Sequence, residues 1–461
     1  MKISRLEATG VYGYLPISID FHEDLTFLTG LNGSGKTTAL RLLMGLLAPS
    51  IDELVEIKFN EVKAIVVDKS KEIVLKAVRT PDVMIITIST QKGSLEIPTA
   101  IIQTLTDAHH REEPRSPIYM QISVNPVIRA IRELSTPMFL GLDRRLHIDD
   151  LDTEPAPRIR RLDSEFRHRL AGSSEVSIRR VTDAILADVN DLVVVALTEI
   201  RAAQERLDEN LRNQILLDSF RYESTGAHMR TVPTRATLNT FRERQAAVEK
   251  AAAGLRLPVG ELQSSLTDFF ERMTQIVSAL EDQSKQKIQA KTKNAGKSDP
   301  VPEYSNDIIE WVMNSRQADR IFKQIELLDE YVTKRAKLHQ PIDRFLELTN
   351  RFLEQTGKKV KVSPRGDLRV SLSGSDLDRR LFALSSGERQ LVVMLAHLSL
   401  NKRLAGSGVF IVDEPELSLH IGWQEQFVDA IQQANPKVQL ILATHSPAII
   451  LEREENCRSL S

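Results

Sequence analysis

The sequence predicts an α/β domain that is split into two halves by a long, mostly helical insertion. A glycine-rich loop near the N-terminus lies between an apolar strand and an apolar-periodic helix. Two continuous apolar runs near the C-terminus are typical of buried parallel strands. The chain between these features has helical periodicity. We therefore expect an N-terminal half at residues 1–150, a helical insertion at 151–356 and a C-terminal half at 357–461.

Length and composition limit the class of protein. The chain has 461 residues, 41% of them hydrophobic, which is enough for two or three domains. Its 61 Lys and Arg against 63 Asp and Glu give a net charge of −2, so any nucleic-acid binding must use a local patch. The one cysteine, Cys457, indicates a reducing compartment. No apolar run reaches the roughly 18 residues of a membrane span, so we expect a cytoplasmic protein without a membrane partner.

The N-terminal half is predicted to be rich in strands. Alternating and then apolar segments in residues 1–29 indicate short strands before the glycine loop. The helix after the loop is expected to stop before Pro49. Further β-rich segments follow, separated by Asp, Lys, Ser, Gly and Pro, and they predict an antiparallel meander. These segments are 54–59 ("LVEIKF"), 63–68, 72–78, 83–90 and 116–123, with a buried strand in 136–145.

The insertion is predicted to contain antiparallel helices. A polar segment with Gly and two prolines, 291–305, indicates a loop between two of them. A helical hairpin or short coiled coil fits this pattern, and because the apolar spacing is not a clean heptad, a bundle remains an alternative. The helical patterns cover 174–220, 238–255, 261–291, 306–337 and 341–358.

The C-terminal half returns to α/β character. A hairpin is expected at 358–372 around "SPRGD", and a helix begins near Ser386. The apolar strand "GVFIVDEPE", a helix at 422–434, the apolar strand "VQLILATHS" and a short tail follow. The order indicates one nucleotide-binding domain that resumes after the insertion.

The segment "GLNGSGKT" fits the phosphate-binding pattern G-x-x-x-x-G-K-[ST]. Its glycines let the backbone curl so that N–H groups point at phosphate oxygens, and the helix start adds positive dipole. Lys36 is expected to bridge the β- and γ-phosphates, and Thr37 to bind Mg²⁺. A glycine turn without a ligand would not need to join a strand to a helix, as this loop does. The predicted nucleotide-binding residues are Gly30, Asn32, Gly33, Ser34, Gly35, Lys36, Thr37 and Thr38, with ATP and Mg²⁺ as cofactors.

Polar residues follow both C-terminal apolar strands. Ligands of such sheets lie at the carboxyl ends of parallel strands. Asp413 is therefore predicted to hold Mg²⁺ through water, and Glu414 to orient or deprotonate the attacking water. His445 is expected to reach the γ-phosphate from the same edge. An acidic turn after a core strand and a structural histidine are the alternatives.

The stretch "LSSGERQ" at Leu384–Gln390 completes a resemblance to the ABC-type ATPases. It is similar to their signature motif, and closer to the SMC/RecF-like branch, which includes OLD-related AAA families, than to transporter subunits. The resemblance implies an ABC-type P-loop ATPase head with a mixed sheet and an antiparallel β subdomain. It also implies that the signature caps the γ-phosphate of ATP held by a second subunit, so that two heads sandwich ATP. The implied contacts are Ser385, Ser386, Gly387 and Glu388.

Other positions follow from the same resemblance. The D-loop falls at 416–420, where His420 replaces the usual Asp. The γ-phosphate-sensing glutamine has two candidate positions, and the adenine-contacting aromatic has two candidate residues. They are Gln121 or the strand end at 143–145 for the first, and Tyr12 or Tyr14 for the second.

The organisation of the chain resembles the compact ATPases of the anti-phage Septu, PARIS and retron systems. This resemblance implies a separately encoded HNH or TOPRIM-type nuclease partner and a homo-oligomer built from dimers, such as a hexamer. A RecF/SMC-like DNA repair ATPase that binds DNA is the alternative. The basic cluster at 157–170 could contact phosphates or form a charged helix face. A single-chain OLD nuclease is not expected, because only 14 residues follow Pro447.

Overall fold

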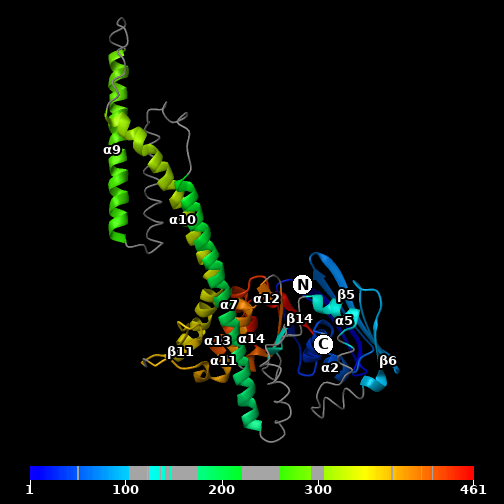
Figure 1. The fold of residues 1–461 in the computed structure, drawn as a ribbon. Coiled ribbons are helices and arrows are strands. Elements are labelled where there is room, and N and C mark those ends of the chain that lie inside the picture. Colours follow the sequence, from blue (N-terminus) through cyan, green and yellow to red (C-terminus); the bar gives the residue numbers. More distant parts are fainter. Residues whose placement is uncertain are drawn as a thin grey trace. The chain divides into compact units, whose positions relative to one another are not determined.

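The chain forms two compact units, which we describe separately. The head comprises Met1–Leu197 and Pro341–Ser461, and the arm comprises Thr198–Gln340 (Figure 1). The arm is shorter than the predicted insertion, because the head-side ends of two long helices belong to the head. The computed structural model describes residues 1–48, 51–102, 122, 124–134, 137–140, 146–147, 174–220, 259–291, 306–374, 377–405, 408–417 and 419–460.

The first sheet of the head is an antiparallel meander, as predicted. Its strand order is β2-β1-β4-β5-β6-β7, and its strands alternate between buried and more exposed residues. The edge strand β7 was not predicted; it is short and ends in Pro98, which an edge position tolerates. The strands are β1 (Lys2–Val11), β2 (Leu15–Asp20), β4 (Glu61–Asp68), β5 (Lys71–Arg79), β6 (Val83–Ile88) and β7 (Leu95–Pro98).

The predicted strand "LVEIKF" is wrong. Residues Ile51–Glu56 form helix α2 instead. Arg41 binds Glu53 and Glu56, both at 2.5 Å. These two carboxylates are three residues apart, so a helix places them on one face, where a single guanidinium reaches both. This tertiary contact overrides the strand-like composition of the segment.

The second sheet of the head is mixed and carries the nucleotide-loop strand. Its order is β14-β3-β13-β12-β8-β9. All neighbours are parallel except β8 and β9. The tail, for which no strand was predicted, forms the edge strand β14. The strands are β3 (Leu25–Thr29), β8 (Met138–Leu140), β9 (Leu146–His147), β12 (Val409–Asp413), β13 (Gln439–Ala443) and β14 (Cys457–Ser459).

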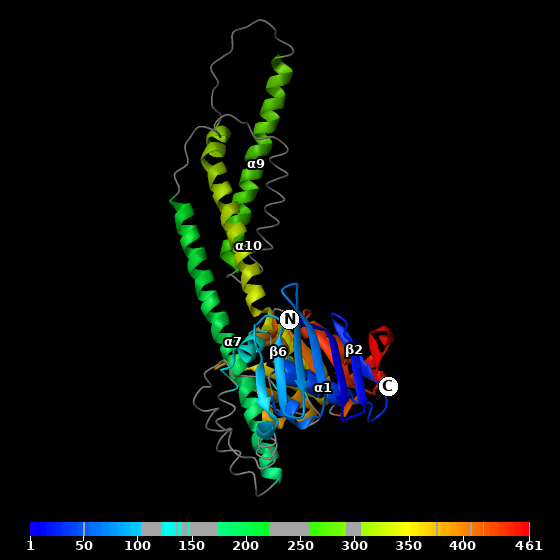
Figure 2. The same ribbon diagram turned by 90° about the vertical axis from the view of Figure 1, so that its right-hand side faces the viewer.

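Helix α1 (Lys36–Leu47) connects the two sheets. It contacts β4 and β5 of the antiparallel sheet and β12 of the mixed sheet (Figure 2). Leu40, Leu43 and Leu47 are buried in a core that includes residues from both sheets. The helix ends at Leu47, before Pro49, as predicted. The apolar burial fixes the glycine loop at its N-terminus against the mixed sheet.

The C-terminal half supplies the other elements around the site. The predicted hairpin forms from β10 (Lys358–Val362) and β11 (Leu368–Leu372), with Val360 opposite Val370. The helix predicted near Ser386 is α11 (Ser386–Leu400). It is followed by α12 (Lys402–Ala405), α13 (Ile421–Ala434) and α14 (Pro447–Ile450), and α5 (Pro126–Glu133) lies in the N-terminal half.

The arm consists of antiparallel helices among its described residues, as predicted. They are α9 (Val259–Lys291), the part of α7 (Ser174–Ser219) from Thr198 onward and the part of α10 (Asn306–Leu353) up to Gln340. Phe270 of α9 stacks on Phe322 of α10, with ring centroids 5.2 Å apart. Asp208 of α7 accepts a hydrogen bond from Tyr331 of α10 at 2.6 Å. The patterns predicted at 306–337 and 341–358 are one helix through Pro341, not two.

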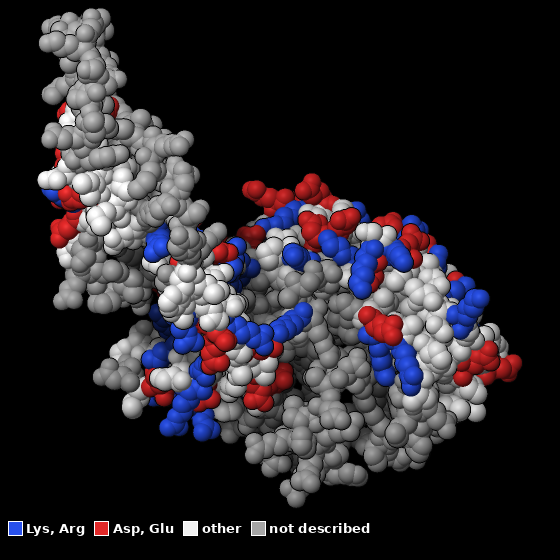
Figure 3. All heavy atoms as spheres, turned by 45° about the horizontal axis from the view of Figure 1, so that its top comes forward, with Lys and Arg blue, Asp and Glu red and all other residues white. Residues whose placement is uncertain are grey.

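The described helices and one face of the surface can be compared with the composition. No helix of the described residues is long and apolar enough to cross a membrane. On the face shown in Figure 3, Lys and Arg side chains are interspersed with Asp and Glu. This face is therefore not uniformly positive, which agrees with the net charge of −2.

Candidate functional site

Three parallel strands of the mixed sheet end at one edge and bring the predicted site together. Ala443, the last residue of β13, pairs with Leu28 of β3 on one side and with Asp413 of β12 on the other. The glycine loop follows β3, Glu414 follows β12 and His445 follows β13. The loop, the acidic pair and the histidine thus share one carboxyl edge, where ligands of such sheets bind.

The backbone of the glycine loop requires glycine at two of its positions for steric reasons. Gly30 has φ 143°, and a Cβ there would lie 2.3 Å from the Leu460 carbonyl oxygen. Gly35 has φ 93°, and a Cβ there would lie 2.6 Å from Leu15 Cδ2. The sequence did not indicate these two neighbours, since both are distant in the chain. Gly33 has φ 85° and open space around it, so its left-handed backbone alone favours glycine.

The loop presents a helix N-terminus to the edge of the sheet. No side chain caps α1 at Gly35, so its first N–H groups remain available for an anion. Lys36 is buried, and its ammonium donates to the carbonyl oxygens of Gly30 at 3.0 Å and Leu31 at 3.2 Å. The lysine therefore lies over the loop that is predicted to hold phosphates.

The remaining predicted loop residues surround this N-terminus. Asn32 is exposed, whereas Thr37 and Thr38 are half-buried. The backbone N–H of Ser34 donates to Leu31 O at 3.1 Å, which closes the turn of the loop. The Ser34 hydroxyl is buried and has no hydrogen-bonding partner among the described residues.

Asp413 is the least satisfied polar group at this edge. Its side chain is buried, with a residue exposure of 3%. Neither of its carboxylate oxygens has a hydrogen-bonding partner among the described residues. Burial raises the pKa of Asp413 to about 6; the charges of Glu414 and Glu416 add to the rise, while the Thr37 hydroxyl and Lys36 oppose it. The Thr37 hydroxyl is thus near the carboxylate without meeting the geometry of a hydrogen bond.

This donor set fits Mg²⁺ bound with a nucleotide. An unpaired buried carboxylate is costly unless a cation or water compensates it, and Thr37 offers a hydroxyl oxygen beside it. Among the described residues, no group of three His, Cys, Asp or Glu side chains could hold a metal alone. Mg²⁺ commonly takes one or two protein oxygens and completes its shell with phosphates and water. Asp413 and Thr37 are the residues that would hold it.

Glu414 has an unusual backbone conformation that directs it away from the strand. Its φ is 48°, in the left-handed region that residues other than glycine rarely adopt. Its N–H donates to Ala443 O at 2.8 Å, which continues the pairing of β12 with β13 by one residue. The side chain is half-buried. A strained residue at a strand end is typical of functional sites, and this one carries the predicted catalytic carboxylate.

Glu416 begins the predicted D-loop, but the sequence predicted no contact for its side chain. Its Oε2 accepts from the Thr444 hydroxyl and its Oε1 from the His445 N–H, both at 2.8 Å. The carboxylate therefore connects the turn after β12 to the turn after β13. Its position one residue past a proline in "DEPE" was the only available signal. Since Thr444 and His445 are 28 and 29 residues away, the contact could not be read from the sequence.

His445 lies where the prediction placed it, next to the ends of β12 and β3. Its side chain is exposed, while its backbone is held by Glu416. The next residue, Ser446, donates its hydroxyl hydrogen to Gln424 Oε1 at 2.6 Å. A rigid backbone with an exposed imidazole suits a residue that contacts a ligand rather than the core.

The signature stretch forms a capped helix start. Ser385 is the N-cap of α11: its hydroxyl accepts from the Glu388 N–H at 3.4 Å, and its own N–H donates to Glu388 Oε2 at 2.6 Å. This is a capping box, which fixes the helix start. Ser385 and Ser386 are exposed and Gly387 is half-buried. The helix start is therefore accessible to an anion from outside the chain.

The environment of Glu388 differs from the one that its predicted role requires. Glu388 was expected to contact nucleotide, but its exposure is only 2%. Besides Ser385, it accepts hydrogen bonds from the Thr356 hydroxyl at 2.8 Å and from Lys358 Nζ at 2.7 and 3.0 Å. Burial opposes the ionised form, but the hydrogen bonds from Lys358, Ser385 and Thr356 outweigh it, so the pKa of Glu388 is lowered. In this conformation Glu388 holds the signature helix to β10 and is not open to a ligand.

The D-loop histidine has a structural role. His420 is the N-cap of α13, and its Nδ1 accepts from the Gly422 N–H at 3.3 Å. Asp and Asn are common N-caps because their side-chain oxygen accepts the same bond. The imidazole thus replaces the usual aspartate at the helix start. Ser418, within the same stretch, lies outside the described residues.

The structure describes the candidate residues for contacting adenine but not those for sensing the γ-phosphate. Tyr12 and Tyr14 lie in the exposed turn between β1 and β2. Leu15, the next residue, lies beside Gly35 of the loop, so this turn is close to the nucleotide site. Both tyrosines stay predicted adenine contacts. Gln121, the strand end at 143–145 and the basic cluster at 157–170 lie outside the described residues.

Comparisons with known proteins relate the C-terminal part of the chain to ATPases. Residues 292–452 match a family described as "AAA domain, putative AbiEii toxin, Type IV TA system". Over 101 residues the chain is 33% identical to the retron Vc95 probable ATPase of Vibrio cholerae serotype O1 biovar El Tor, covering 20% of this chain and 19% of that protein. Over 94 residues it is 27% identical to the retron Ec83 probable ATPase of Escherichia coli, covering 18% and 17%. The chain thus spans less than a fifth of the length of the curated relatives it matches. The predicted resemblance to a retron-associated ATPase is confirmed.

Two of the solved structures that match the chain are SMC heads. One is the Smc head domain with an extended coiled coil bound to the C-terminal domain of ScpA from Pyrococcus furiosus. It is 12% identical with a TM-score of 0.36, over 99% of this chain and 93% of that one. Another is the SmcHead bound to the C-winged helix domain of ScpA, which is 11% identical with a TM-score of 0.40, over 100% and 94%.

Proposed function

We propose that this chain is the ATP-binding and ATP-hydrolysing subunit of an anti-phage defence complex. Two heads close around ATP and control a separately encoded nuclease. The observation that carries the proposal is Asp413, a buried carboxylate without a partner among the described residues, beside Thr37 at the end of the phosphate loop. The match of residues 292–452 to an AAA family and the similarity to retron ATPases support the same function.

Binding of nucleotide follows from the loop. Its backbone N–H groups and the N-terminus of α1 receive phosphate oxygens, and the Lys36 ammonium moves from the carbonyls of Gly30 and Leu31 to the phosphates. Asp413 and Thr37 hold Mg²⁺, which neutralises phosphate charge when bound. Ionised Asp413 then gains the compensation that it lacks without a ligand.

Hydrolysis requires a group that orients water, and we assign this role to Glu414. Its left-handed backbone directs the side chain out of the strand, and the hydrogen bond from its N–H to Ala443 O fixes the turn. His445 follows Ala443 with its backbone held by Glu416. Glu414 can accept a proton from water, while the His445 imidazole contacts the γ-phosphate.

The signature helix supplies the second half of the site to a partner head. Ser385 and Ser386 are exposed at the N-terminus of α11, where free N–H groups and the helix dipole favour an anion. Two heads arranged in this way place each signature over the other head's nucleotide. Such dimers assemble further into a homo-oligomer, such as a hexamer, in the cytoplasm and hold an HNH or TOPRIM-type nuclease.

Phage challenge of cells that carry the operon tests the defence role. Lys36→Ala removes the ammonium that binds phosphate and should abolish protection. Lys71→Ala, an exposed lysine at the start of β5, is the matched control and should protect like the wild type. Protection that survives Lys36→Ala would exclude nucleotide control of defence. A neighbouring reading frame without a nuclease would exclude the proposed partner.

Head dimerisation is tested separately. Ser385→Arg places a bulky cation at the exposed signature start, so ATP-dependent association, followed by light scattering, should be lost while ATP still binds at Lys36. Ser373→Arg, in the exposed turn after β11, is the control for an added arginine. Unchanged association of Ser385→Arg would contradict the sandwich arrangement.

A RecF/SMC-like DNA repair ATPase is the second candidate. The antiparallel helices α7, α9 and α10, up to 48 residues long, favour it, because long helical arms also suit ATPases that act on DNA. This function predicts ATP-dependent DNA binding by the chain alone, measured by electrophoretic mobility shift. DNA binding that is lost in Lys36→Ala, together with absent protection against phage, would favour repair over defence.

A further inference from the structure

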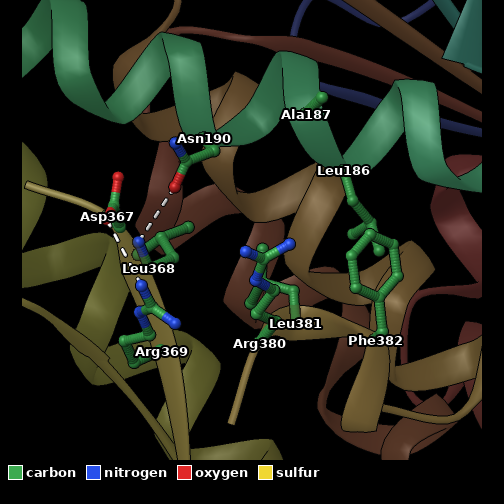
Figure 4. A pocket seen from close by; sticks show the side chains of 9 residues that line it. All are labelled: Leu186, Ala187, Asn190, Asp367, Leu368, Arg369, Arg380, Leu381 and Phe382. Carbon is green, nitrogen blue, oxygen red and sulfur yellow. Dashed lines mark hydrogen bonds and ion pairs between the residues drawn. The ribbon is translucent and has the colours of Figure 1, made fainter.

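The head has a pocket of about 300 Å³ that belongs to none of the motifs. It lies where α7, the β10–β11 hairpin and the turn before α11 meet, and Figure 4 shows side chains from all three converging on it. Leu186 and Asn190 come from α7, and Arg369 comes from β11. Arg380 and Phe382 come from the turn before the signature.

The walls of the pocket combine apolar surface with positive charge. Leu186, Leu368 and Leu381 are buried, while Phe382 is 47% exposed and presents apolar surface to solvent. Arg380 is exposed and makes no ion pair with any residue that the structure describes. An exposed aromatic ring next to an unpaired guanidinium can bind a group that is apolar at one end and anionic at the other.

Positive charge continues from the pocket over the outer face of the hairpin. Lys361 pairs directly with Arg369 across the two strands, and Lys359 lies two residues away on the same face. Asp378 neutralises Lys361 at 2.7 Å, and Asp367 lies 3.5 Å from Arg369. Lys359 has no ion pair with a described residue. The surface beside the pocket therefore favours acidic partners.

The shape of the pocket favours a polypeptide over a free small molecule. Small-molecule sites bury most of the ligand surface, whereas here Ala187, Arg380 and Phe382 are exposed on the rim. A polypeptide can place one anchor side chain in such a pocket and extend over the adjoining basic face. We propose that this pocket docks an acidic segment of a partner polypeptide. One bulky apolar side chain enters between Leu186 and Phe382, and flanking carboxylates pair with Arg369 and Arg380.

The pocket is connected to the signature helix by short contacts. The Leu384 N–H donates to Leu381 O at 3.0 Å, and the next residue, Ser385, is the cap of α11. On the other side, Asp188 of α7 lies 3.4 Å from the buried His397 of α11. A segment that orders the turn before α11 therefore also orders the start of the signature helix. This inference does not depend on the proposed role in defence.

A bridge to β11 fixes the turn in relation to the pocket. Val370 and Arg379 exchange two backbone hydrogen bonds of 2.8 Å, and the Asn190 side chain accepts from the Leu368 N–H at 3.0 Å. The side chains of Arg380 and Phe382 are not part of this network. Substitutions of these two side chains should therefore leave the fold intact, which makes them suitable for a binding test.

The test uses the full chain and a random-sequence peptide library displayed on phage. Peptides enriched on the wild type and not on Arg380→Glu are synthesised with fluorescein and measured by fluorescence anisotropy. We expect enriched peptides to have two or more carboxylates around one aromatic or large aliphatic residue. Arg380→Glu should weaken their binding by at least about tenfold, because a charge-assisted hydrogen bond is replaced by repulsion.

Two further variants separate docking from loss of folding. Ala187→Trp fills the pocket from an exposed position on α7 and should also abolish binding; Val195→Trp, exposed on the same helix, should not. Arg365→Glu, an exposed arginine in the hairpin turn outside the pocket, is the charge control and should keep at least half of the affinity. Each variant is confirmed to be folded if its thermal unfolding midpoint equals that of the wild type.

Hydrogen exchange with bound peptide tests the connection to the signature. Amides in residues 380–389 should exchange more slowly, and those in α13 should not change. Three results would overturn the docking proposal: enrichment that does not depend on Arg380, a basic consensus, or equal binding by Ala187→Trp and the wild type. Self-association of the chain that is lost in Arg380→Glu would replace the partner with a second copy and would also overturn it.

Discussion

Asp413 and Glu388 are both buried carboxylates of the head, but their surroundings differ. Glu388 accepts hydrogen bonds from Ser385, Thr356 and Lys358, whereas Asp413 accepts none from the described residues. The pKa is accordingly lowered for Glu388 and raised to about 6 for Asp413. Glu388 at the signature start is hydrogen-bonded within its own chain, while the Asp413 carboxylate at the sheet edge has no hydrogen-bonding partner among the described residues. The difference indicates that the sheet edge around Asp413 needs a bound cation, whereas the signature start around Glu388 is already fixed without a ligand.

The largest expected effect comes from Glu414, the proposed catalytic carboxylate. Glu414→Gln keeps the size of the side chain but cannot accept a proton, so kcat for ATP hydrolysis should fall by about 10²- to 10⁴-fold. ATP-bound dimers should accumulate at the same time. Phosphate release assays and light scattering measure the two effects, and Glu425→Gln, exposed on α13, is the control. Unchanged turnover would remove Glu414 from the mechanism.

The next effect concerns the affinity for nucleotide. Lys36→Ala removes the ammonium that we propose contacts the β- and γ-phosphates. Since each such charge-assisted contact is worth about 1.5–3 kcal/mol, losing two should lower ATP affinity on the order of 100-fold or more. Calorimetric titration of the full chain with Mg²⁺-ATP measures it, with Lys71→Ala as control. If Lys36→Ala binds as tightly as the control, the glycine loop is not the phosphate site.

The third prediction concerns the ion pair between Lys358 and Glu388, which holds the start of the signature helix. Lys358→Met leaves Glu388 buried with less compensation, which should lower the free energy of unfolding by about 3 kcal/mol. Chemical denaturation measures this loss. The double variant with Glu388→Gln should recover part of it, because the uncompensated charge is then gone. A stable Lys358→Met protein would show that the ion pair does not hold the signature helix.

The smallest effect is the pH dependence of the same pair. The folded pKa of Glu388 lies below its usual 4.5, so its ionisation stabilises the folded state above that pH, and the contribution is lost as the pH falls through the folded pKa. The difference in unfolding free energy between the wild type and Glu388→Gln should therefore be constant near pH 7 and shrink below pH 4.5. Denaturation at a series of pH values measures it; a difference that grows in acid would contradict the assignment.

Local patterns predicted most of this fold because the relevant contacts are short-range in the chain. The glycine loop, the two apolar strands and the signature helix each have their pattern within about 20 residues. The segment 54–59 failed because Arg41, outside it, holds Glu53 and Glu56 in a helix. The two helical patterns form one helix through Pro341, which the usual helix-breaking effect of proline does not predict.

The sequence predicted those site residues that directly follow a strand or begin a helix. The roles of Glu416 and Lys358 were not predicted, since their partners lie about 30 residues away in the chain. The prediction for Glu388 came from the motif and could not include Lys358. Long-range polar contacts leave no periodic signal in a sequence, so only the structure places them.

The most direct test compares the thermal unfolding of the wild type and Asp413→Asn at pH 7.5, with and without Mg²⁺-ATP. Because the pKa of Asp413 is raised from 3.8 to about 6, its ionised form costs the folded state on the order of 3 kcal/mol above pH 6, and this cost disappears as the pH falls. Without ligand, Asp413→Asn should therefore be at least as stable as the wild type. With Mg²⁺-ATP the wild type and the control Asp82→Asn should gain the full stabilisation, whereas Asp413→Asn should gain clearly less. The claim that Asp413 helps to bind Mg²⁺ would be contradicted if Asp413→Asn were less stable than the wild type without ligand, or if it kept the full stabilisation by Mg²⁺-ATP.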